Sequence, residues 1–299
     1  MHFQVILNRD GGSLRTIDVD GFGERLRQVL EAAGHQVAVT IVDGGEMDVA
    51  LDEAVEGDCD VVMVGGGDGT VSAAAGRLQG SDKALAVLPA GTMNLFARSL
   101  AIPLQLDAAV EALAGGTIRA VDVASANGLI FVHQFSIGLH AKLIRLRERR
   151  SFNSRLGKMR ASLQAGLAAF LNPPRMRATL EVDETEISVT TSGIGVTNNL
   201  FGEGHLPYAD DPAGGVLGIY ITRARRRRDL LVFLANMALG RWKANDKVEI
   251  MTAREVKLRI VRPYRRFGCA IDGELRDLDT ETVLKLHPGA LKVVVPEAG

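Results

Sequence analysis

The pattern of expected secondary structure changes near residue 121. Before that point, short β-type runs alternate with helical stretches, and after it strand-like runs follow one another with few helices between them. Alternation predicts a parallel sheet covered by helices, whereas many strands in succession predict an antiparallel sandwich or barrel. The sequence therefore predicts two domains of different class. In the first region we expect strands at 4–7, 36–42, 60–64 and 84–88 and helices at 23–33, 47–56 and 71–78.

The second region is expected to be rich in strands. The boundary between the two domains falls at residues 122–123, and two helices, at 139–171 and 229–239, interrupt the strands. The expected strands are 121–124, 130–136, 176–182, 186–191, 194–198, 217–221, 247–251, 255–260, 269–271 and 283–285.

The composition is that of a folded globular protein and gives no sign of a disulfide-rich or membrane-spanning one. The chain has 299 residues, of which 46% are hydrophobic and 24% charged, values typical of a folded globular protein. The formal net charge of −1 shows no overall excess of positive charge for nucleic acid. Cys59 and Cys269 form no CxxC pair, so we expect a reducing compartment. The N-terminus carries no signal-peptide pattern and no apolar run is long enough to span a bilayer, so we expect a soluble, cytoplasmic protein.

The apolar strand expected at 60–64 runs directly into the glycine-rich segment GGGDGT at residues 65–70. Glycines let backbone N–H groups approach phosphate oxygens closely, and the start of the following helix adds a favourable dipole. An acid in such a loop would repel phosphate unless a cation lies between them, so Asp68 is a candidate Mg²⁺ ligand, directly or through water. For this loop alone, a tight turn without a ligand is the simpler interpretation.

Two further strand ends carry similar loops. In LPAGTMNLFAR, residues 88–98, Gly91 and Thr92 offer N–H groups and a hydroxyl, and Asn94 can cap the next helix or orient a ligand. The segment NRDGGS, residues 8–13, follows the first strand. Because ligands bind beyond the carboxyl ends of parallel strands, one nucleotide triphosphate site explains all three loops together.

The motif GGDGT at 66–70, followed by PxGTxNxxAR at 89–98, resembles the diacylglycerol kinase catalytic family. This family includes bacterial lipid kinases, sphingosine kinases and ceramide kinases. The resemblance continues in FxxxFSIG at 131–138, IDGE at 271–274 and PxALKV at 288–293, so it spans nearly the whole chain in the family's order.

This resemblance implies an NAD-kinase-like α/β nucleotide-binding domain at 1–122, to which residues 286–299 return, and a β-sandwich lipid-substrate domain at 123–285. It also implies ATP and Mg²⁺ as cofactors and transfer of the γ-phosphate to the hydroxyl of a membrane lipid. Diacylglycerol is the first candidate for the acceptor lipid, and ceramide and a sphingoid base are the alternatives.

The resemblance assigns roles to individual residues. Glu274 matches the family's proton acceptor, and a weakly nucleophilic lipid hydroxyl does need a carboxylate to take its proton. The alternative is a plain hairpin turn at Asp272–Gly273, which could also present the base. Asp122 matches an acid of a water-mediated Mg²⁺ network that also includes Asp68. The expected nucleotide contacts are Asn8, Thr40, Gly66, Gly67, Asp68, Gly69, Thr70, Gly91, Thr92 and Asn94.

The sequence departs from the family pattern at two positions. Leu95 stands where many bacterial relatives carry an acid after the asparagine of the second loop. Gly214 stands where the family has the aspartate of an Asp-Gly pair linked to a structural Mg²⁺. Without an acid at Leu95, metal coordination would depend more on Asp68, Asp122 and phosphate oxygens. The structural Mg²⁺ site would need Asp210 or Asp211 as a substitute.

Two basic segments predict peripheral contact with an anionic membrane surface. Residues 145–160 contain six arginines and one lysine and precede the apolar segment 163–171, and residues 223–228 contain five arginines and precede 230–239. Each cation near such a surface contributes about 1 kcal/mol. A solvated helix face, or arginines paired with the chain's own acids, is the alternative. Aromatic residues are only 5% of the chain, which argues against stacking on nucleic acid bases.

Two other functions compete with the lipid kinase. An NAD kinase shares the glycine-acid loop and would phosphorylate a soluble dinucleotide without any need for lipid vesicles. A regulator that binds nucleotide or lipid without turnover is the third hypothesis, and the departures at Leu95 and Gly214 favour it. The presence of both Asp68 and Glu274 favours the enzyme.

Overall fold

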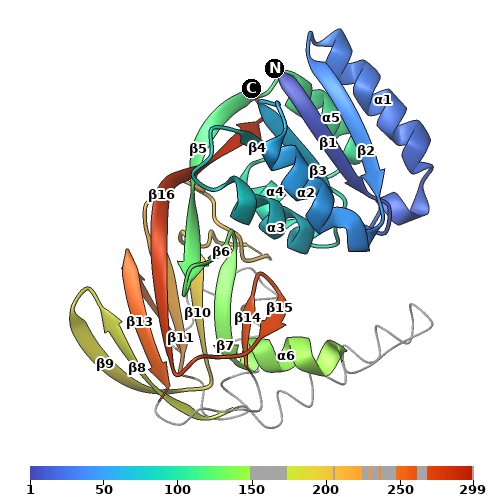
Figure 1. Ribbon diagram of the computed structural model, residues 1–299. Coiled ribbons are helices and arrows are strands. Elements are labelled where there is room, and N and C mark those ends of the chain that lie inside the picture. The colour runs from blue at the N-terminus through green and yellow to red at the C-terminus, as the bar shows by residue number, and fades with distance from the viewer. Residues whose placement is uncertain are drawn as a thin grey trace. The chain divides into compact units, whose positions relative to one another are not determined.

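The computed structural model describes residues 1–148, 174–204, 206–223, 229, 236, 247–260 and 268–297 (Figure 1). The chain divides into two compact units. Unit 1 contains residues 1–123, 210–214 and 287–299, and unit 2 contains residues 124–209 and 215–286.

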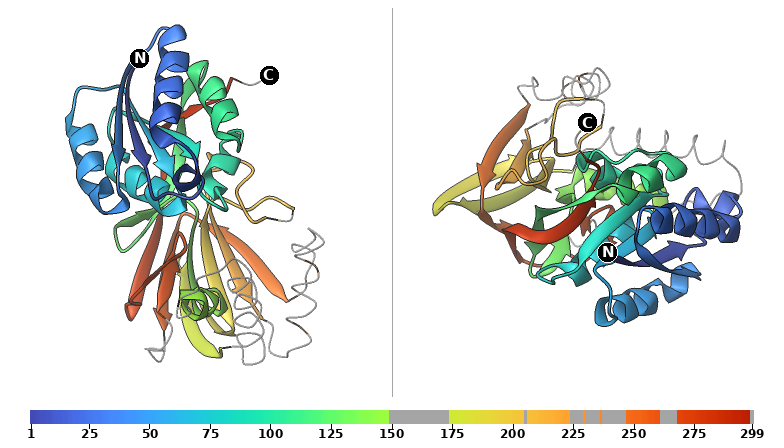
Figure 2. Two further views of the ribbon diagram at one scale, coloured as in Figure 1. Left: turned by 90° about the vertical axis from the view of Figure 1, so that its right-hand side faces the viewer. Right: turned by 90° about the horizontal axis from the view of Figure 1, so that it is seen from above.

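Unit 1 is built on a parallel sheet in the order β2-β1-β3-β4, with the C-terminal part of β16 added beside β4. Helices α1 and α5 pack against one face and α2 and α3 against the other (Figures 1 and 2). Every residue of β3 and β4 is buried, as expected for parallel strands covered on both faces. The elements are β1 (His2–Asn8), η1 (Leu14–Thr16), α1 (Val19–Ala32), β2 (Gln36–Val42), η2 (Gly44–Glu46), α2 (Met47–Glu56), β3 (Val61–Gly66), α3 (Asp68–Leu78), β4 (Ala84–Pro89), α4 (Leu95–Ser99) and α5 (Leu106–Ala114).

Local sequence explains the first helix. Asp18 caps α1 by accepting the N–H of Gly21 at 3.1 Å. The helix buries Phe22, Leu26 and Leu30, which are four residues apart and so lie on one face. An added Cβ at Gly23 would lie 3.4 Å from Val39, which shows how closely α1 approaches β2. The helix begins four residues before the expected start, because Gly21 and Gly23 near its beginning disfavour a helix locally although Val19 and Phe22 are buried there.

Unit 2 is a β-sandwich of two antiparallel layers. One layer has the order β16-β13-β8-β9 and the other the order β12-β11-β10-β7-β14-β15. Its core includes Phe135, Ile137 and Val196 of one layer and Leu180 and Leu258 of the other. The elements are β5 (Thr117–Ala126, shared with unit 1), β6 (Leu129–Phe131), β7 (Gln134–Gly138), α6 (Leu139–Glu148), β8 (Met176–Val182), β9 (Thr185–Thr191), β10 (Gly193–Asn198), β11 (Leu217–Thr222), β12 (Val248–Ala253), β13 (Glu255–Ile260), β14 (Cys269–Ile271), β15 (Glu274–Arg276) and β16 (Glu281–Val295, shared with unit 1).

The expected fold class, a parallel α/β domain and a β-sandwich, is confirmed. Several element assignments were wrong in detail. The single strand expected at 130–136 is two strands, β6 and β7, separated by Val132 and His133. The strand expected at 283–285 is the fifteen-residue β16, and α4, α5 and β15 were not expected. Of the helix expected at 139–171 the described part is α6, and the helix expected at 229–239 lies outside the described residues except for residues 229 and 236.

Candidate functional site

The three glycine-rich loops of unit 1 meet at Ala90. The N–H of Ala90 donates to the carbonyl of Gly66 at 3.1 Å, so the loops after β3 and β4 are joined directly. The carbonyl of Ala90 accepts the N–H of Ser13 at 2.8 Å and its hydroxyl at 3.3 Å, which adds the loop after β1. Adjacent parallel strands end at the same edge, and these bonds bring the ends of β1, β3 and β4 together there.

The glycines of these loops are required by close backbone contacts. A Cβ on Gly91 would lie 2.8 Å from the Cα of Gly67, and a Cβ on Gly66 would lie 2.6 Å from the side chain of Thr70. Gly12 has φ +36°, and a Cβ there would overlap the carbonyl oxygen of Ala90. The three loops therefore pack backbone against backbone, with no room for side chains between them. Glycine-rich backbone of this kind is what a phosphate-binding loop uses.

Asp68 connects two of the loops. Its carboxylate accepts the N–H of Asn94 at 3.1 Å and that of Leu95 at 2.7 Å. These bonds cap the start of α4, a role for which the sequence suggested Asn94. The Asn94 side chain instead donates to the carbonyls of Gly91 at 2.9 Å and Pro89 at 3.3 Å, and its backbone is left-handed with φ 51°. Asp68, which belongs to the loop after β3, thus fixes the backbone of the loop after β4.

The start of α3 is available to an anion. Its N-cap is Gly67, which has no side chain to cap the helix. The first N–H groups of a helix have no acceptor within the helix, and the dipole favours negative charge at this end. Asp68, Gly69 and Thr70, which form the first turn, are half-buried, and Thr92 on the neighbouring loop is exposed.

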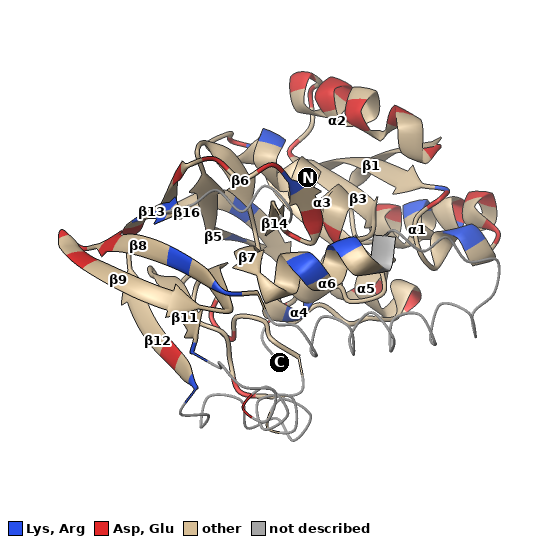
Figure 3. Ribbon diagram, turned by 90° about the horizontal axis from the view of Figure 1, so that it is seen from below, with Lys and Arg blue, Asp and Glu red and all other residues tan. Residues whose placement is uncertain are grey.

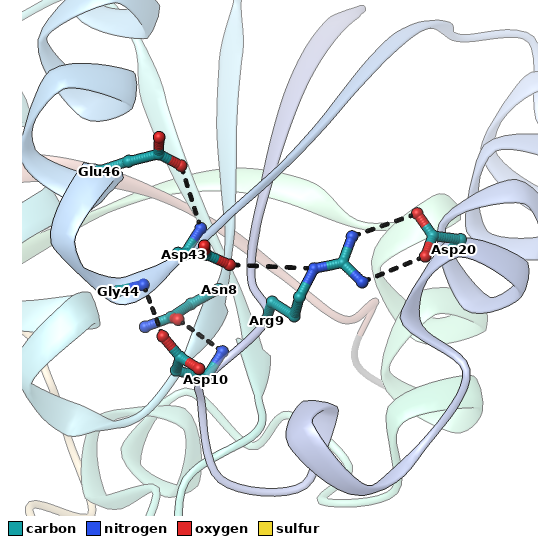
Figure 4. A network of polar contacts seen from close by, with 7 residues as sticks. All are labelled: Asn8, Arg9, Asp10, Asp20, Asp43, Gly44 and Glu46. Carbon is teal, nitrogen blue, oxygen red and sulfur yellow. Dashed lines mark hydrogen bonds and ion pairs between the residues drawn. The ribbon is translucent and has the colours of Figure 1, made fainter.

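A polar network borders the carboxyl ends of β1 and β2 (Figure 4). Arg9 pairs with Asp20 at 3.2 Å and with Asp43 at 4.0 Å. Asn8 accepts the N–H of Asp10 at 3.0 Å, and the Asp10 carboxylate accepts the N–H of Gly44 at 2.9 Å. The amide oxygen of Asn8 is therefore used in the loop itself. Sequence reasoning singled out Asn8 but missed the ion pairs, because their partners are distant in sequence.

Thr40 and Asp122 are held by other contacts of unit 1. Thr40 is exposed on β2 and accepts a hydrogen bond from Gln4 at 3.0 Å. Asp122 is 2% exposed, accepts the N–H of Gly289 at 2.9 Å and donates its own N–H to Pro212 at 2.9 Å. The Asp68 carboxylate is bonded to the loop after β4 instead. The expected joint role of Asp68 and Asp122 at a metal ion stays a prediction.

In unit 2, Glu274 lies directly after a tight turn. Asp272 and Gly273 have φ 45° and 88°, and Ile271 pairs with Glu274 across the turn, which confirms the hairpin. The Glu274 side chain is 59% exposed and pairs with Arg276 at 3.2 Å. A carboxylate at the exposed tip of a hairpin can approach a substrate hydroxyl.

Burial disfavours the charged form of two histidines of unit 2. Burial lowers the pKa of His133 to about 3, with a further contribution from His140. The His133 ring stacks on Phe201 with centroids 4.9 Å apart, and its Nε2 has no hydrogen-bond partner among the described residues. Burial also lowers the pKa of His140, whose Nδ1 lies 2.6 Å from the hydroxyl of Ser136. The sequence did not single out either residue.

The donor set of unit 1 fits a Mg²⁺ ion that arrives with a nucleotide. Among the described residues, no three His, Cys, Asp or Glu side chains are grouped as metal ligands. Mg²⁺ in kinase sites is held by one or two carboxylates together with substrate phosphates and waters. Each Asp68 oxygen accepts one N–H and keeps a second lone pair, so this carboxylate can still take part in such a shell.

Charge is distributed unevenly within each unit. Figure 3 shows acidic residues along α2 and basic residues on α6. In unit 1, Arg77 pairs with Asp48 at 2.8 Å and Asp52 at 2.6 Å on α2. In unit 2, burial lowers the pKa of the Lys142 ammonium on α6. Most of the expected membrane-contacting segments, 147–160, 163–171 and 224–228, lie outside the residues whose side chains are described.

None of the described helices is both long and apolar enough to cross a bilayer.

The fold and the loops define a protein with an α/β domain of the nucleotide-binding type and a β-sandwich domain. The model of the diacylglycerol kinase catalytic domain matches residues 2–126, and that of the YegS C-terminal NAD kinase beta sandwich-like domain matches residues 134–295. With these two domains the chain belongs to the family that combines the diacylglycerol kinase catalytic domain with the YegS C-terminal domain, which confirms the resemblance seen in the motifs.

Three relatives illustrate this membership. The chain is 27% identical to an uncharacterized protein from Synechocystis sp. over 252 residues, which cover 81% of this chain and 56% of that protein. It is 33% identical to a diacylglycerol kinase from Bacillus subtilis over 119 residues, 38% of this chain and 39% of that one. A crystal structure of a diacylglycerol kinase from Bacillus anthracis matches with a TM-score of 0.75 and 20% identity, covering 99% of this chain and 97% of that chain. These two sequence matches span only 56% and 39% of the relatives' own lengths.

Proposed function

We propose that the chain is an ATP- and Mg²⁺-dependent lipid kinase that transfers the γ-phosphate to a lipid hydroxyl, with diacylglycerol as the default acceptor. One observation carries the proposal. The glycine loops after β3 and β4 touch, with Gly91 too close to Gly67 to carry a side chain, and Asp68 links them beside the start of α3. This arrangement presents N–H groups for phosphate and a carboxylate for its counter-ion.

Catalysis in such a site comes from positioning and charge neutralisation. The N–H groups at the start of α3 would hold phosphate oxygens, and Asp68 would keep the loop of Gly91 and Thr92 beside them. Mg²⁺, when bound, would neutralise charge that develops on the phosphate oxygens. Asp122 is the second carboxylate that the family resemblance assigns to the ion's water shell.

The acceptor side of the reaction is assigned to Glu274. As the bond between phosphorus and the lipid oxygen forms, the bond from phosphorus to the leaving ADP oxygen breaks, and the hydroxyl proton passes to the Glu274 carboxylate. The exposure of Glu274 and its place next to a tight turn support this role. The exposed carboxylate can reach a hydroxyl that a membrane presents.

The polar network at β1 and β2 supports one orientation of the nucleotide. The network holds three carboxylates, those of Asp10, Asp20 and Asp43, and one guanidinium, that of Arg9. Its excess of negative charge repels a triphosphate. Carboxylates and the nearby Asn8 and Thr40 suit hydroxyl groups and ring nitrogens. The nucleoside end would therefore lie toward β1 and β2 and the phosphates over α3.

The substrate also defines where the enzyme works. Its lipid lies in a bilayer, so we propose a cytoplasmic protein that contacts anionic membranes peripherally through its arginine-rich segments. On the described part of α6, Arg145 belongs to the first of these segments and Lys142 lies three residues before it.

The test is transfer of labelled phosphate from MgATP to vesicles that contain diacylglycerol, ceramide or a sphingoid base, with NAD as a soluble acceptor. A labelled lipid that is missing with Asp68→Ala supports the proposal and identifies the substrate. Label in NAD instead would move the activity to the NAD kinases. Measurable ATP binding without any product would favour the regulator that binds without turnover.

A further inference from the structure

The strand that carries Glu274 is weakly supported by its own pairing. β14 and β15 have three residues each, and among the described strands β15 lies at the end of its layer and pairs with β14 alone. β14 is held on its other side by β7, and α6 packs against both strands, but β15 has no second strand neighbour among the described strands. What holds the turn at Asp272 and Gly273 therefore contributes to the position of Glu274.

The Asp272 carboxylate holds that turn against the segment before β7. One oxygen accepts the N–H groups of His133 at 3.0 Å and Gln134 at 2.9 Å, and the other accepts the N–H of Val132 at 2.9 Å. The N–H of Asp272 donates to the carbonyl of Gln134 at 2.9 Å. Bonds from N–H groups to a carboxylate are stronger than those between neutral groups. They also explain why residues 132–133 interrupt the expected strand: the acid replaces a strand neighbour there.

Further hydrogen bonds connect residues 132–133 to the middle of the layer. The carbonyl of Val132 accepts the side-chain amide of Asn198 at 3.2 Å, and the carbonyl of His133 accepts the N–H of Asn198 at 3.0 Å. Asn198 is the last residue of β10, an interior strand. Through Asp272, the edge hairpin is thus attached to a strand that lies beyond β7.

A second hairpin shows that the turn itself does not need these bonds. Asp183 and Glu184 join β8 to β9 with φ 46° and 67°, a conformation similar to that of Asp272 and Gly273. Asp183 makes no hydrogen bond or ion pair with any described residue. The bonds of Asp272 are therefore additional to turn formation.

We propose that Asp272 is a positioning residue for phosphoryl transfer, which holds the β14–β15 hairpin so that the Glu274 carboxylate stays in reach of the acceptor hydroxyl. The inference rests on the proposed function, because it takes Glu274 as the proton acceptor. A displacement of about 1 Å in a reacting group can cost about 100-fold in rate. Such a displacement would change kcat and leave the nucleotide loops of unit 1 unaltered.

The first experiment compares Asp272→Asn with the matched control Asp183→Asn. Asparagine accepts left-handed backbone, so both turns are kept, but the amide introduced by Asp272→Asn would direct N–H groups at backbone donors. We expect kcat to fall by about 10- to 100-fold in Asp272→Asn with an unchanged KM for ATP, and no change in Asp183→Asn. If thermal unfolding shows that Asp272→Asn does not fold, Asp272→Gly keeps the turn and removes only the carboxylate. Unchanged kcat in a folded variant would overturn the inference.

The decisive measurement repeats Asp272→Asn in a Glu274→Gln background. If Asp272 acts through Glu274, the second substitution has little further effect on kcat. If it lowers kcat by the same factor in both backgrounds, its role is merely structural and the inference is wrong. A Glu274→Gln enzyme with full activity would instead overturn the proton-acceptor assignment of the proposed function, so the two failures are distinguishable.

Discussion

The Asp68 carboxylate accepts the N–H of Leu95 at 2.7 Å, so the acid of the first glycine loop caps the helix that follows the second. Leu95 stands where the family resemblance leads us to expect an acid, yet its backbone is still tied to Asp68. The residue expected to organise a metal ion therefore also organises the protein around it.

This dual role gives the first prediction. Asp68→Ala should abolish transfer and also lower the free energy of unfolding by about 0.5–2 kcal/mol, because α4 loses its cap. Activity and chemical denaturation measured on the same preparation check both effects. Asp68→Asn, which keeps one acceptor oxygen, should recover part of the stability but not the activity. Full activity in either variant would contradict the role of the loop.

Substitution of Gly91 tests the close approach of the two loops. In Gly91→Ala the new Cβ would lie 2.8 Å from Gly67, so the loops must separate, and ATP affinity should fall with a loss of about 1–3 kcal/mol in stability. Gly115→Ala is the control, since no atom lies within 4 Å of its added Cβ. Calorimetric titration with MgATP measures the difference. Equal affinity in the two variants would mean that the ligand does not use this contact.

Substitution of Glu274 should separate chemistry from stability. Glu274→Gln removes the proton acceptor and should lower kcat about 10²- to 10⁴-fold. The side chain is exposed and its ion pair with Arg276 is a surface contact, so the melting temperature should hardly change. Glu281→Gln, which breaks the surface pair with Arg259 at 2.6 Å, is the matched control and should keep normal activity. A large fall in kcat in the control as well would show that the effect is not specific to Glu274.

Buried His133 predicts acid sensitivity. Its pKa falls from 6.5 to about 3 on folding, because burial disfavours the charged ring. Below pH 6.5 the unfolded chain binds a proton that the folded chain does not, so this residue lowers the free energy of unfolding as the pH falls from about 6.5 towards 3. The loss should reach about 2 kcal/mol at pH 5.

The check is denaturant unfolding of wild type and His133→Asn between pH 7 and 5. The substitution should reduce the slope of stability against pH over this range, whatever it does to stability at pH 7. An identical slope in both proteins would show that His133 can be protonated in the folded state. Burial also lowers the pKa of His140, so this residue adds to the slope in the same direction.

The alternation of apolar runs and glycine loops in the first 120 residues, and the succession of strands after them, were enough to predict the two fold classes. The reason is that periodicity and glycine placement are local properties of a chain. For the same reason β2, α2, β8, β13 and β14 were located at the residue level. The motifs 66–70 and 271–274 were likewise sufficient to suggest the family.

Only the tertiary structure decided which atoms those residues use. Asp68 reaches the N–H of Leu95 across 27 positions, and Asp272 reaches Val132 across 140, and neither partner carries a side-chain signal that sequence could reveal. Both partners are backbone N–H groups, which every residue except proline possesses. Their selection depends on how strands are ordered in the two units, and that order is set by burial of the whole core rather than by any local pattern.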